Sequence, residues 1–216
     1  MTLLPTARAA GWYREALQHG ELARDHAAVW RLFPGDDKPR DFLFRVGTSR
    51  ADGALSYYVV SKRAPAPEPG VLEVEIKEYA PKLIVGETLA FSLRANPTVS
   101  RGEHGRRGKR HDVLMDAKRR ASPDKREEAI QEAAIEWLVD RAPTIGLGID
   151  AEHIRYDRYV QHLSRRSHGP PLRFSSVDFD GVATVTDPSK LVVALFTGVG
   201  HSKGFGCGLL LIRRFM

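Results

Sequence analysis

The chain has 216 residues, 42% of them hydrophobic, and a formal net charge of +6 at pH 7, and this length accommodates one ordinary domain or two small ones. Its apolar stretches fall short of the roughly 20 residues of a membrane span, and the single cysteine, Cys207, excludes an internal disulfide framework and a multi-cysteine zinc site. We therefore expect a soluble protein of the cytoplasm that does not bind a membrane.

The first half of the chain predicts one helix among several strands. Residues Glu21–Phe33 keep apolar side chains at helical spacing, follow Gly20 and precede Pro34, which favours a helix. Short apolar or alternating runs predict strands, two of which are joined by a turn that contains Asp52-Gly53. The predicted strands are Met1–Leu4, Asp41–Val46, Ser56–Val60, Leu72–Tyr79 and Leu89–Ala95.

The second half begins with a segment, Val99–Arg110, that is rich in glycine and arginine and lacks apolar periodicity. We expect a mobile loop there. A long helix is predicted over Pro123–Arg141 with Ser122 as its N-cap, and Asp187 is expected to cap a last helix that runs through Phe196. The remaining predicted elements are the paired strands Ile154–Leu163 and Phe174–Val185, joined by a Pro-Gly connection, and a final strand, Leu209–Ile212.

The order of these elements predicts an α+β fold made of two ferredoxin-like (RRM-like) domains in tandem. Such domains have an antiparallel sheet with helices on one face. We place the N-terminal domain, which carries His26, at residues 1–97 and the C-terminal domain at residues 98–216.

Arginine and lysine gather in two parts of the chain, after Arg94 and around the predicted strand Ile154–Leu163. Clustered basic residues indicate a polyanion partner, because neutralising phosphates releases counterions, whereas a solvated surface that aids solubility is the alternative. Arginine's planar fork favours nucleic acid, although charge does not distinguish RNA from DNA. The residues that we expect to bind nucleic acid are Arg101, Arg106, Arg107, Lys109, Arg110, Lys118, Arg119, Arg155, Arg158, Arg165 and Arg166.

The glycine-rich segment Gly198–Gly208 is the most specific local feature. Alternating glycines let a backbone approach a ligand closely and turn its amides outward as an anion site, and Ser202 and Lys203 would add donors for phosphate. The spacing differs from that of a P-loop or a dinucleotide fingerprint. A tight packed connection is the alternative, but packing would not require Lys203.

His26 lies in line with the apolar stripe of the predicted helix. A histidine in that position is usually a half-buried packing residue. Cleavage of RNA by its own 2′-hydroxyl, however, needs a proton acceptor and a proton donor, and histidine titrates in the right range for either. Arg31 and Lys203 could stabilise the charge that develops on the phosphate.

Several other chemistries are not indicated by the sequence. The His, Asp and Glu residues show no spacing typical of a metal site, and the carboxylate cluster of a two-metal nuclease is absent. We therefore expect no metal and no other cofactor. Serine and cysteine nucleophile motifs, and a helix-turn-helix signal for DNA, are missing as well.

Several short motifs fall in order along nearly the whole chain. They are His26 followed by Trp30 and Leu32-Phe33-Pro34, Asp41-Phe42-Leu43-Phe44, Leu93-Arg94-Ala95-Asn96-Pro97, Phe179-Asp180-Gly181, Gly198-Val199-Gly200-His201-Ser202-Lys203 and Gly206-Cys207-Gly208-Leu209-Leu210. Each motif is short, but together they are specific, and they resemble the CRISPR repeat endoribonucleases of type I-E Cascade systems, the CasE group.

The resemblance implies two ferredoxin-like domains and an enzyme that cuts the precursor CRISPR transcript at the base of each repeat hairpin. Cutting would need no metal, would use the 2′-hydroxyl as nucleophile, and would leave a 5′-hydroxyl and a 2′,3′-cyclic phosphate or 3′-phosphate. His26 matches the family's catalytic histidine, and Arg31 falls where some members place a catalytic lysine. The basic residues would grip the RNA stem, and the product would stay bound within Cascade beside its other subunits.

The chain departs from the family pattern at Ala23. Members often have a tyrosine at this position, three residues before the histidine. The sequence therefore leaves two alternatives open, a repeat-cutting endoribonuclease and a non-catalytic hairpin RNA-binding subunit of the same fold. It also leaves open whether His26 would act as base, acid or both in turn.

Overall fold

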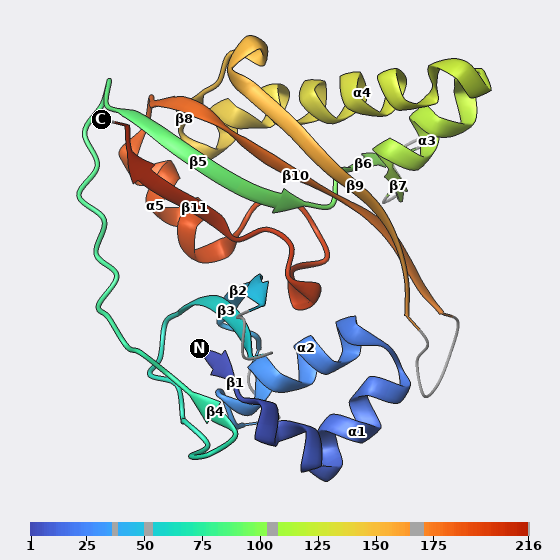
Figure 1. Ribbon diagram of the computed structural model, residues 1–216. Coiled ribbons are helices and arrows are strands. Elements are labelled where there is room, and N and C mark those ends of the chain that lie inside the picture. The colour runs from blue at the N-terminus through green and yellow to red at the C-terminus, as the bar shows by residue number, and fades with distance from the viewer. Residues whose placement is uncertain (36–38, 50–53, 103–107, 165–170, 216) are drawn as a thin grey trace.

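The computed structural model describes residues 1–35, 39–49, 54–102, 108–164 and 171–215 of the chain. The strands form two antiparallel sheets and a separate two-stranded ribbon, and helices pack against both sheets (Figure 1). The predicted α+β fold is confirmed.

The N-terminal sheet has the strand order β2-β3-β1-β4, and its neighbouring strands are antiparallel. This order is that of a ferredoxin-like unit. Residues 62–71, between β3 and β4, form no helix, so the unit lacks its second helix. Its elements are β1 (Thr2–Leu3), the 3-10 helix η1 (Pro5–Ala9), α1 (Gly11–Gln18), α2 (Glu21–Arg31), β2 (Phe42–Ser49), β3 (Leu55–Ser61) and β4 (Leu72–Glu73).

Helix α2 forms where the sequence predicts it, because Gly20 (φ 101°) lets the chain turn sharply into the helix. The packed side of α2 carries Ala28 and Val29, which are fully buried in the N-terminal core. Just after the helix, Phe33 stacks on Phe42 of β2 with 4.6 Å between ring centroids. These contacts fix α2 on the sheet.

The C-terminal sheet has β5 between β11 and β10, and β9 and β8 both pair with β10. The order β5, α4, β9, β10, α5, β11 along the chain is the βαββαβ order of a ferredoxin-like unit. Leu138 of α4 and Leu191 of α5 are buried in one core with Leu93 and Phe179 of the sheet. The elements are β5 (Thr88–Ala95), α4 (Arg126–Arg141), η3 (Ala142–Ile145), β8 (Leu147–Gly148), η4 (Ala151–His153), β9 (Ile154–Ser164), β10 (Leu172–Val185), α5 (Pro188–Thr197), η5 (Lys203–Phe205) and β11 (Leu210–Arg214).

Strand β5 belongs to the C-terminal sheet, although the sequence analysis assigned it to a first domain that ends at residue 97. It pairs with β10 from Thr88 to Ala95 and with β11 from Leu89 to Leu93. The chain between β4 and β5 runs irregularly along one side of the molecule (Figure 1). We therefore propose that the two units divide within residues 74–87, and not after residue 97.

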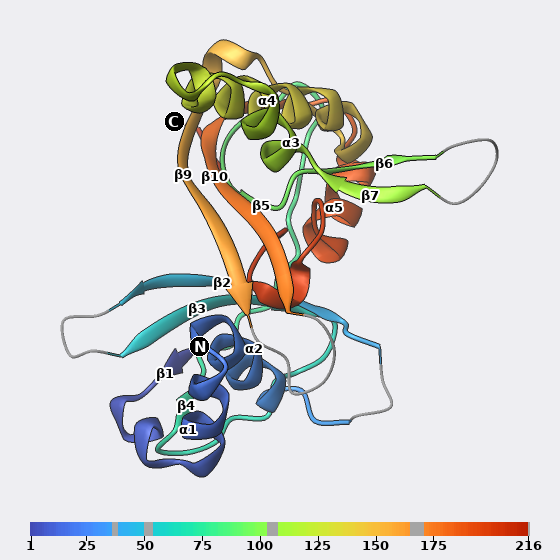
Figure 2. The same cartoon turned by 90° about the vertical axis from the view of Figure 1, so that its right-hand side faces the viewer.

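The segment 99–110 was expected to be a mobile loop, but both of its ends are strands. β6 (Thr98–Arg101) and β7 (Lys109–Asp112) pair in an antiparallel ribbon that projects from the C-terminal unit (Figure 2). A helix that the sequence analysis missed, α3 (Val113–Arg120), follows at once, and the Asp112 carboxylate caps it by accepting a hydrogen bond from the Met115 amide at 3.0 Å. Residues 103–107 lie outside the described residues.

Other predicted elements also need correction. The strand predicted over Leu72–Tyr79 ends at Glu73, and Ile76 is 66% exposed, so the alternation of apolar and charged residues there marks no buried face. Helix α1 was not predicted. Ser122, the predicted N-cap, makes no capping hydrogen bond and precedes the 3-10 turn η2 (Pro123–Lys125). The turn at Asp52-Gly53 and the Pro-Gly connection between β9 and β10 lie outside the described residues.

Several segments of the C-terminal unit reach the N-terminal unit. The long hairpin of β9 and β10 extends down toward it (Figures 1 and 2). The short 3-10 helix η5 contacts both α2 and β2. The glycine-rich segment that contains η5 is thereby placed against the helix that carries His26.

Candidate active site

His26 lies in the middle of α2 and is half-buried under the glycine-rich segment. Its ring stacks on Phe205 with centroids 5.4 Å apart and packs against Trp30 on its own helix at the same separation. Its Nδ1 atom lies 2.8 Å from the carbonyl oxygen of Gly204. The site is thus assembled from two segments that are distant in the sequence.

The partner of Nδ1 assigns the tautomer of His26. A backbone carbonyl can only accept a hydrogen bond, so Nδ1 must carry the proton in this contact. In the neutral ring the lone pair is then on Nε2. Burial lowers the pKa of His26 below its ordinary value, and the charge of Arg40 lowers this pKa further, while the bond to Gly204 opposes both effects. A neutral ring with a free Nε2 lone pair is a proton acceptor.

Close packing accounts for several glycines of the segment Gly198–Gly208. A Cβ atom at Gly208, where φ is +90°, would lie 2.9 Å from the Val199 carbonyl oxygen. The Val199 amide donates to the Gly208 carbonyl at 2.9 Å, so the two ends of the segment are held together. The packing interpretation is therefore correct at Gly208, and it does not exclude phosphate contacts elsewhere in the segment.

Lys203 lies one residue before Gly204, but its ammonium group points to helix α5. Nζ donates to the Thr197 carbonyl oxygen at 2.7 Å, at the C-terminal end of that helix, where a cation also interacts favourably with the helix dipole. Burial lowers the pKa of Lys203, and the charges of Arg40 and Arg141 lower this pKa further. In this structure Lys203 therefore ties η5 to α5.

The structure does not place Arg31 next to His26. Five residues of α-helix rotate a side chain by about 140° around the axis, so the two side chains leave α2 on different sides. The Arg31 Nε atom lies 2.7 Å from a Glu68 carboxylate oxygen, and its guanidinium lies 5.1 Å from the centre of the Trp12 ring. These contacts belong to the N-terminal unit.

Arg40, which precedes β2, was not among the predicted site residues. Its side chain is half-buried, and its Nη1 atom is shielded from solvent and finds no hydrogen-bond partner among the described residues. Its positive charge lowers the pKa of both His26 and Lys203. The sequence gives no local signal for this role, because the role depends on the packing of η5 against both β2 and α2.

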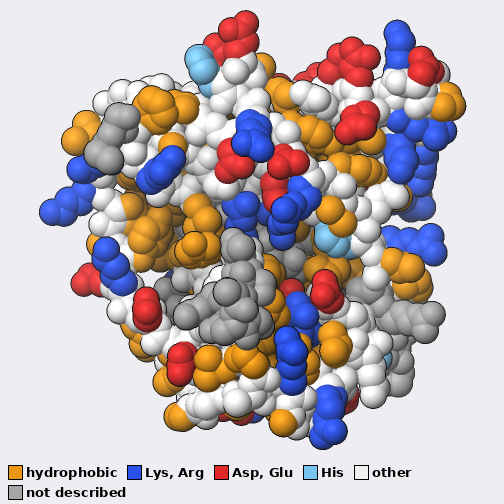
Figure 3. All heavy atoms as spheres, viewed as in Figure 1, with side chains coloured by type: hydrophobic (Ala, Val, Ile, Leu, Met, Phe, Trp, Pro, Cys, Tyr) orange, Lys and Arg blue, Asp and Glu red, His pale blue; other side chains and the backbone are white. Residues whose placement is uncertain are grey.

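The described members of the predicted nucleic-acid-binding set lie on the ribbon, on α3 and on β9. Basic side chains gather over α3 in the upper right of Figure 3. The Lys118 ammonium lies 5.6 Å from the centre of the Tyr159 ring, which connects α3 to β9. The described members are Arg101, Lys109, Arg110, Lys118, Arg119, Arg155 and Arg158. The other members, Arg106, Arg107, Arg165 and Arg166, lie outside the described residues.

Some residues of this set lie beside a carboxylate, and others are exposed to solvent. Arg101 forms an ion pair with Asp116 at 2.7 Å, and Arg155 lies 3.7 Å from Asp157. Ser202, the remaining predicted contact, donates its hydroxyl to the Asn96 side chain at 3.0 Å. Lys109 and Arg110 on β7 are exposed, so they are better placed to reach a ligand.

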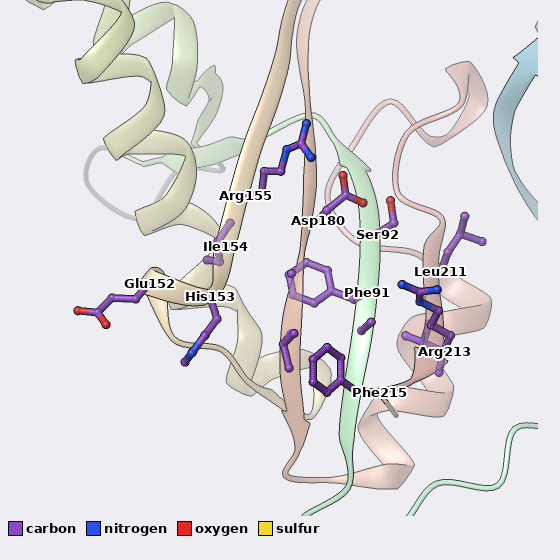
Figure 4. Close-up of a pocket in the computed structure, with 14 residues that line it drawn as sticks. Phe91, Ser92, Glu152, His153, Ile154, Arg155, Asp180, Leu211, Arg213 and Phe215 are labelled. Carbon is purple, nitrogen blue, oxygen red and sulfur yellow. The ribbon is translucent and has the colours of Figure 1, made fainter.

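A cavity of about 740 Å³ lies on the C-terminal sheet, apart from His26 (Figure 4). Phe91, Asp180, Leu211 and Arg213 are among the residues that line it, and Arg155 of the predicted binding set lies at it as well. Neither His26 nor the other predicted catalytic residues contribute to its lining.

The described residues contain no helix that is both long and apolar enough to cross a membrane. Within the same ranges, His, Cys, Asp and Glu side chains form no group of three or more that could hold a metal ion.

Comparisons with known proteins agree with the fold and with the resemblance stated from the sequence. The sequence model of a family described as "CRISPR associated protein" matches residues 1–214. The CRISPR system Cascade subunit CasE of Escherichia coli (strain K12) is 30% identical over 192 residues, which cover 88% of this chain and 90% of that protein.

Solved structures match nearly the whole chain. Cse3 of Thermus thermophilus, bound to an RNA representing a pre-cleavage complex, has a TM-score of 0.70 at 23% identity and covers 98% of this chain and 97% of its own. The CRISPR-associated protein Cas6e of Escherichia coli K-12 has a TM-score of 0.58 at 23% identity, with 99% and 97% coverage. These matches support the tandem ferredoxin-like fold. Together with the sequence matches, they show that the chain belongs to the CasE group of CRISPR-associated proteins.

Proposed function

We propose that this protein is an endoribonuclease that binds the hairpin of a CRISPR repeat and cuts the precursor RNA at the base of the stem. The observation that carries the proposal is the contact between His26 Nδ1 and the Gly204 carbonyl, which leaves Nε2 free to accept a proton. The relatives support it, because Cse3 is described as bound to an RNA representing a pre-cleavage complex.

The reaction that fits this geometry is an internal transfer at the phosphate. Nε2 of His26 accepts the proton of the 2′-hydroxyl, and the 2′-oxygen attacks the adjacent phosphorus. The bond from phosphorus to the 5′-oxygen then breaks, and that oxygen takes up a proton. The products are a 2′,3′-cyclic phosphate and a 5′-hydroxyl, and His26 as proton acceptor requires no metal in this step.

The phosphate gains negative charge during the attack, and a nearby cation lowers the energy of that state. Arg40 is our candidate for this role, because its buried Nη1 atom is unpaired among the described residues and its charge reaches His26. The sequence analysis assigned the role to Arg31 and Lys203, whose charged groups are held by Glu68 and by the Thr197 carbonyl.

The RNA stem would lie along the basic elements of the C-terminal unit. A-form RNA is usually held through its phosphates and the shape of its grooves, which suits the exposed Lys109 and Arg110 on β7 and Arg119 on α3. Contacts of this kind persist after the cut, so the product would stay bound. The Escherichia coli relative is described as a Cascade subunit, and we propose that this chain likewise works in the cytoplasm beside other Cascade subunits.

A non-catalytic hairpin-binding subunit is the second candidate, and Ala23 favours it because it departs from the tyrosine that the family resemblance implies at this position. The test compares the wild type with His26→Ala on the repeat RNA of the matching locus. We expect the wild type to cut the RNA, and His26→Ala to bind the stem with nearly unchanged affinity without cutting it. Tight binding without cutting by the wild type would establish the second candidate instead.

A further inference from the structure

Asn96, the residue that follows β5, is 3% exposed and uses both ends of its side-chain amide. Its Nδ2 donates to the Ser175 carbonyl oxygen at 2.7 Å, and its Oδ1 accepts from the Ser202 hydroxyl at 3.0 Å. A carbonyl oxygen can only accept, so the amide nitrogen must face Ser175 and the amide oxygen must face Ser202. Asn96 therefore joins β10 to the glycine-rich segment.

Ser202 adopts a backbone conformation that serine rarely takes. Its φ is +54°, in the left-handed region, where a side chain costs free energy unless its surroundings hold it. The bond to Asn96 is such a restraint. Two residues later, the carbonyl of Gly204 meets Nδ1 of His26 at 2.8 Å. Ser202 thus begins the short 3-10 turn, Lys203–Phe205, that carries this carbonyl.

The junction at Asn96 also includes the start of helix α3. The Asp112 carboxylate accepts from the Met115 amide at 3.0 Å and from the Ser175 amide at 2.9 Å. Its two oxygens lie 2.7 and 2.6 Å from the Ser175 hydroxyl, which donates its one proton to the carboxylate. The Asn96 Nδ2 lies 3.4 Å from the same carboxylate. The basic helix α3 and strand β10 are therefore linked to Ser202 through a partly buried hydrogen-bond network.

We infer that Asn96 and Ser202 are positioning residues of the proposed cleavage reaction, which hold the Gly204 carbonyl against His26 and thereby keep the proton on Nδ1 and the lone pair on Nε2. The catalytic part of this inference rests on the proposed function, whereas the tautomer is a property of the RNA-free protein. Since α3 and β10 join the same network, it also fixes the position of RNA bound to these two elements relative to the Nε2 atom of His26.

The first test is the ¹⁵N NMR spectrum of the His26 ring in the RNA-free protein at pH 8, where the ring is neutral. The two nitrogens have different shifts according to which one carries the proton. We expect Nδ1–H in the wild type and a mixture of tautomers in Ser202→Gly. Glycine adopts positive φ readily, so this variant removes the hydroxyl without adding strain. Unchanged nitrogen shifts in Ser202→Gly would overturn the inference.

The second test is the single-turnover cleavage rate at saturating RNA. We expect Ser202→Gly to lower the rate about tenfold with unchanged RNA affinity, which is part of the roughly 10²–10⁴-fold that a positioned proton-transfer group contributes. The control is Ser189→Ala, which removes the hydroxyl of an exposed serine in the first turn of α5. The cleavage rate of this variant should match that of the wild type. Mixed tautomers with an unchanged rate would contradict a role for the network in catalysis.

Asn96→Asp gives an independent check, because a carboxylate cannot donate to the Ser175 carbonyl and would face the carboxylate of Asp112. We expect it to show mixed tautomers as well, and wild-type ring shifts in folded Asn96→Asp would count against the inference. If the wild type itself failed to cut RNA, the proposed function would be wrong, while the spectra would still decide whether Ser202 sets the tautomer.

Discussion

The Nδ1 atom of His26 lies 2.8 Å from the carbonyl oxygen of Gly204, although 178 positions separate the two residues along the chain. This contact joins the N-terminal unit, which supplies the imidazole, to the C-terminal unit, which supplies the carbonyl. It determines which ring nitrogen is free to accept a proton.

The cleavage rate should depend on pH through His26. A protonated ring cannot accept a proton, so the single-turnover rate should rise as the pH rises through the pKa of His26 and then become constant. Burial lowers this pKa below 6.5, and a group is about 90% deprotonated one unit above its pKa. The plateau should therefore be reached by about pH 7.5. A rate that falls as the pH rises from 5 to 7.5 would contradict the role of His26 as the base.

Arg40→Gln should lower the plateau rate about 100-fold, because it removes one preorganised donor to the developing charge. It should also move the midpoint of the pH profile upward, since Arg40 lowers the pKa of His26. The matched control is Arg14→Gln, which removes the same charge from an exposed position on α1 and should leave both quantities unchanged.

The same assay separates Arg40 from the assignment made on sequence grounds. Arg31 is held by Glu68 and packs on Trp12, so Arg31→Gln should have a smaller effect on the plateau rate than Arg40→Gln. A larger loss in Arg31→Gln would restore the sequence-based assignment and would require Arg31 to leave Glu68 when RNA binds.

Alanine substitutions at Lys109, Arg110 and Arg119 should weaken RNA binding and reduce its salt dependence. The affinity falls as the salt concentration rises, and each lost phosphate contact makes the slope of log affinity against log salt shallower by about 1. Cleavage of RNA that is already bound should be unchanged, because these residues belong to β7 and α3, whereas His26 belongs to α2. Lys82→Ala, on the exposed segment between β4 and β5, is the control. An unchanged slope in all three variants would remove β7 and α3 from the interface.

Tyr57→Phe should destabilise the N-terminal unit. The Tyr57 hydroxyl donates to the Asp25 carboxylate at 2.6 Å, beside the ion pair of Asp25 with Arg24, and all three residues are buried. Loss of a buried hydrogen bond to a charged group costs about 1.5–3 kcal/mol. Urea denaturation would measure the change as a lower midpoint with an unchanged slope. An unchanged midpoint would mean that this bond adds nothing to the stability of the unit.

The sequence predicted the elements whose signals are local. Helix α2 and most strands of the two sheets follow from apolar periodicity, and Asp187 caps α5 as expected, with its carboxylate accepting from the Lys190 amide at 3.0 Å. The strand predicted after Leu72 failed because its alternating charges do not border a core, as the exposed Ile76 shows. The ribbon was not predicted because its two strands are short and carry a single apolar residue, Val99, so they show no alternating pattern.

The candidate site was predictable in part. His26 was found from its helix and from the family resemblance. Arg40 and Asn96 were not assigned roles, because their surroundings arise when η5 packs on the N-terminal unit and when β10 meets the glycine-rich segment. Long-range packing of this kind leaves no periodic signal in the sequence. The placement of Lys203 against the Thr197 carbonyl could not be foreseen for the same reason.

The most direct test of the central claim is cleavage of the matching repeat hairpin in EDTA, beside the same RNA with a single 2′-deoxy nucleotide at the cut site. The account predicts that the all-ribose RNA is cut to a 2′,3′-cyclic phosphate and a 5′-hydroxyl, while the 2′-deoxy RNA is bound equally well and stays intact. Cutting of the 2′-deoxy RNA, or loss of all cutting in EDTA, would contradict attack by a 2′-hydroxyl that His26 deprotonates.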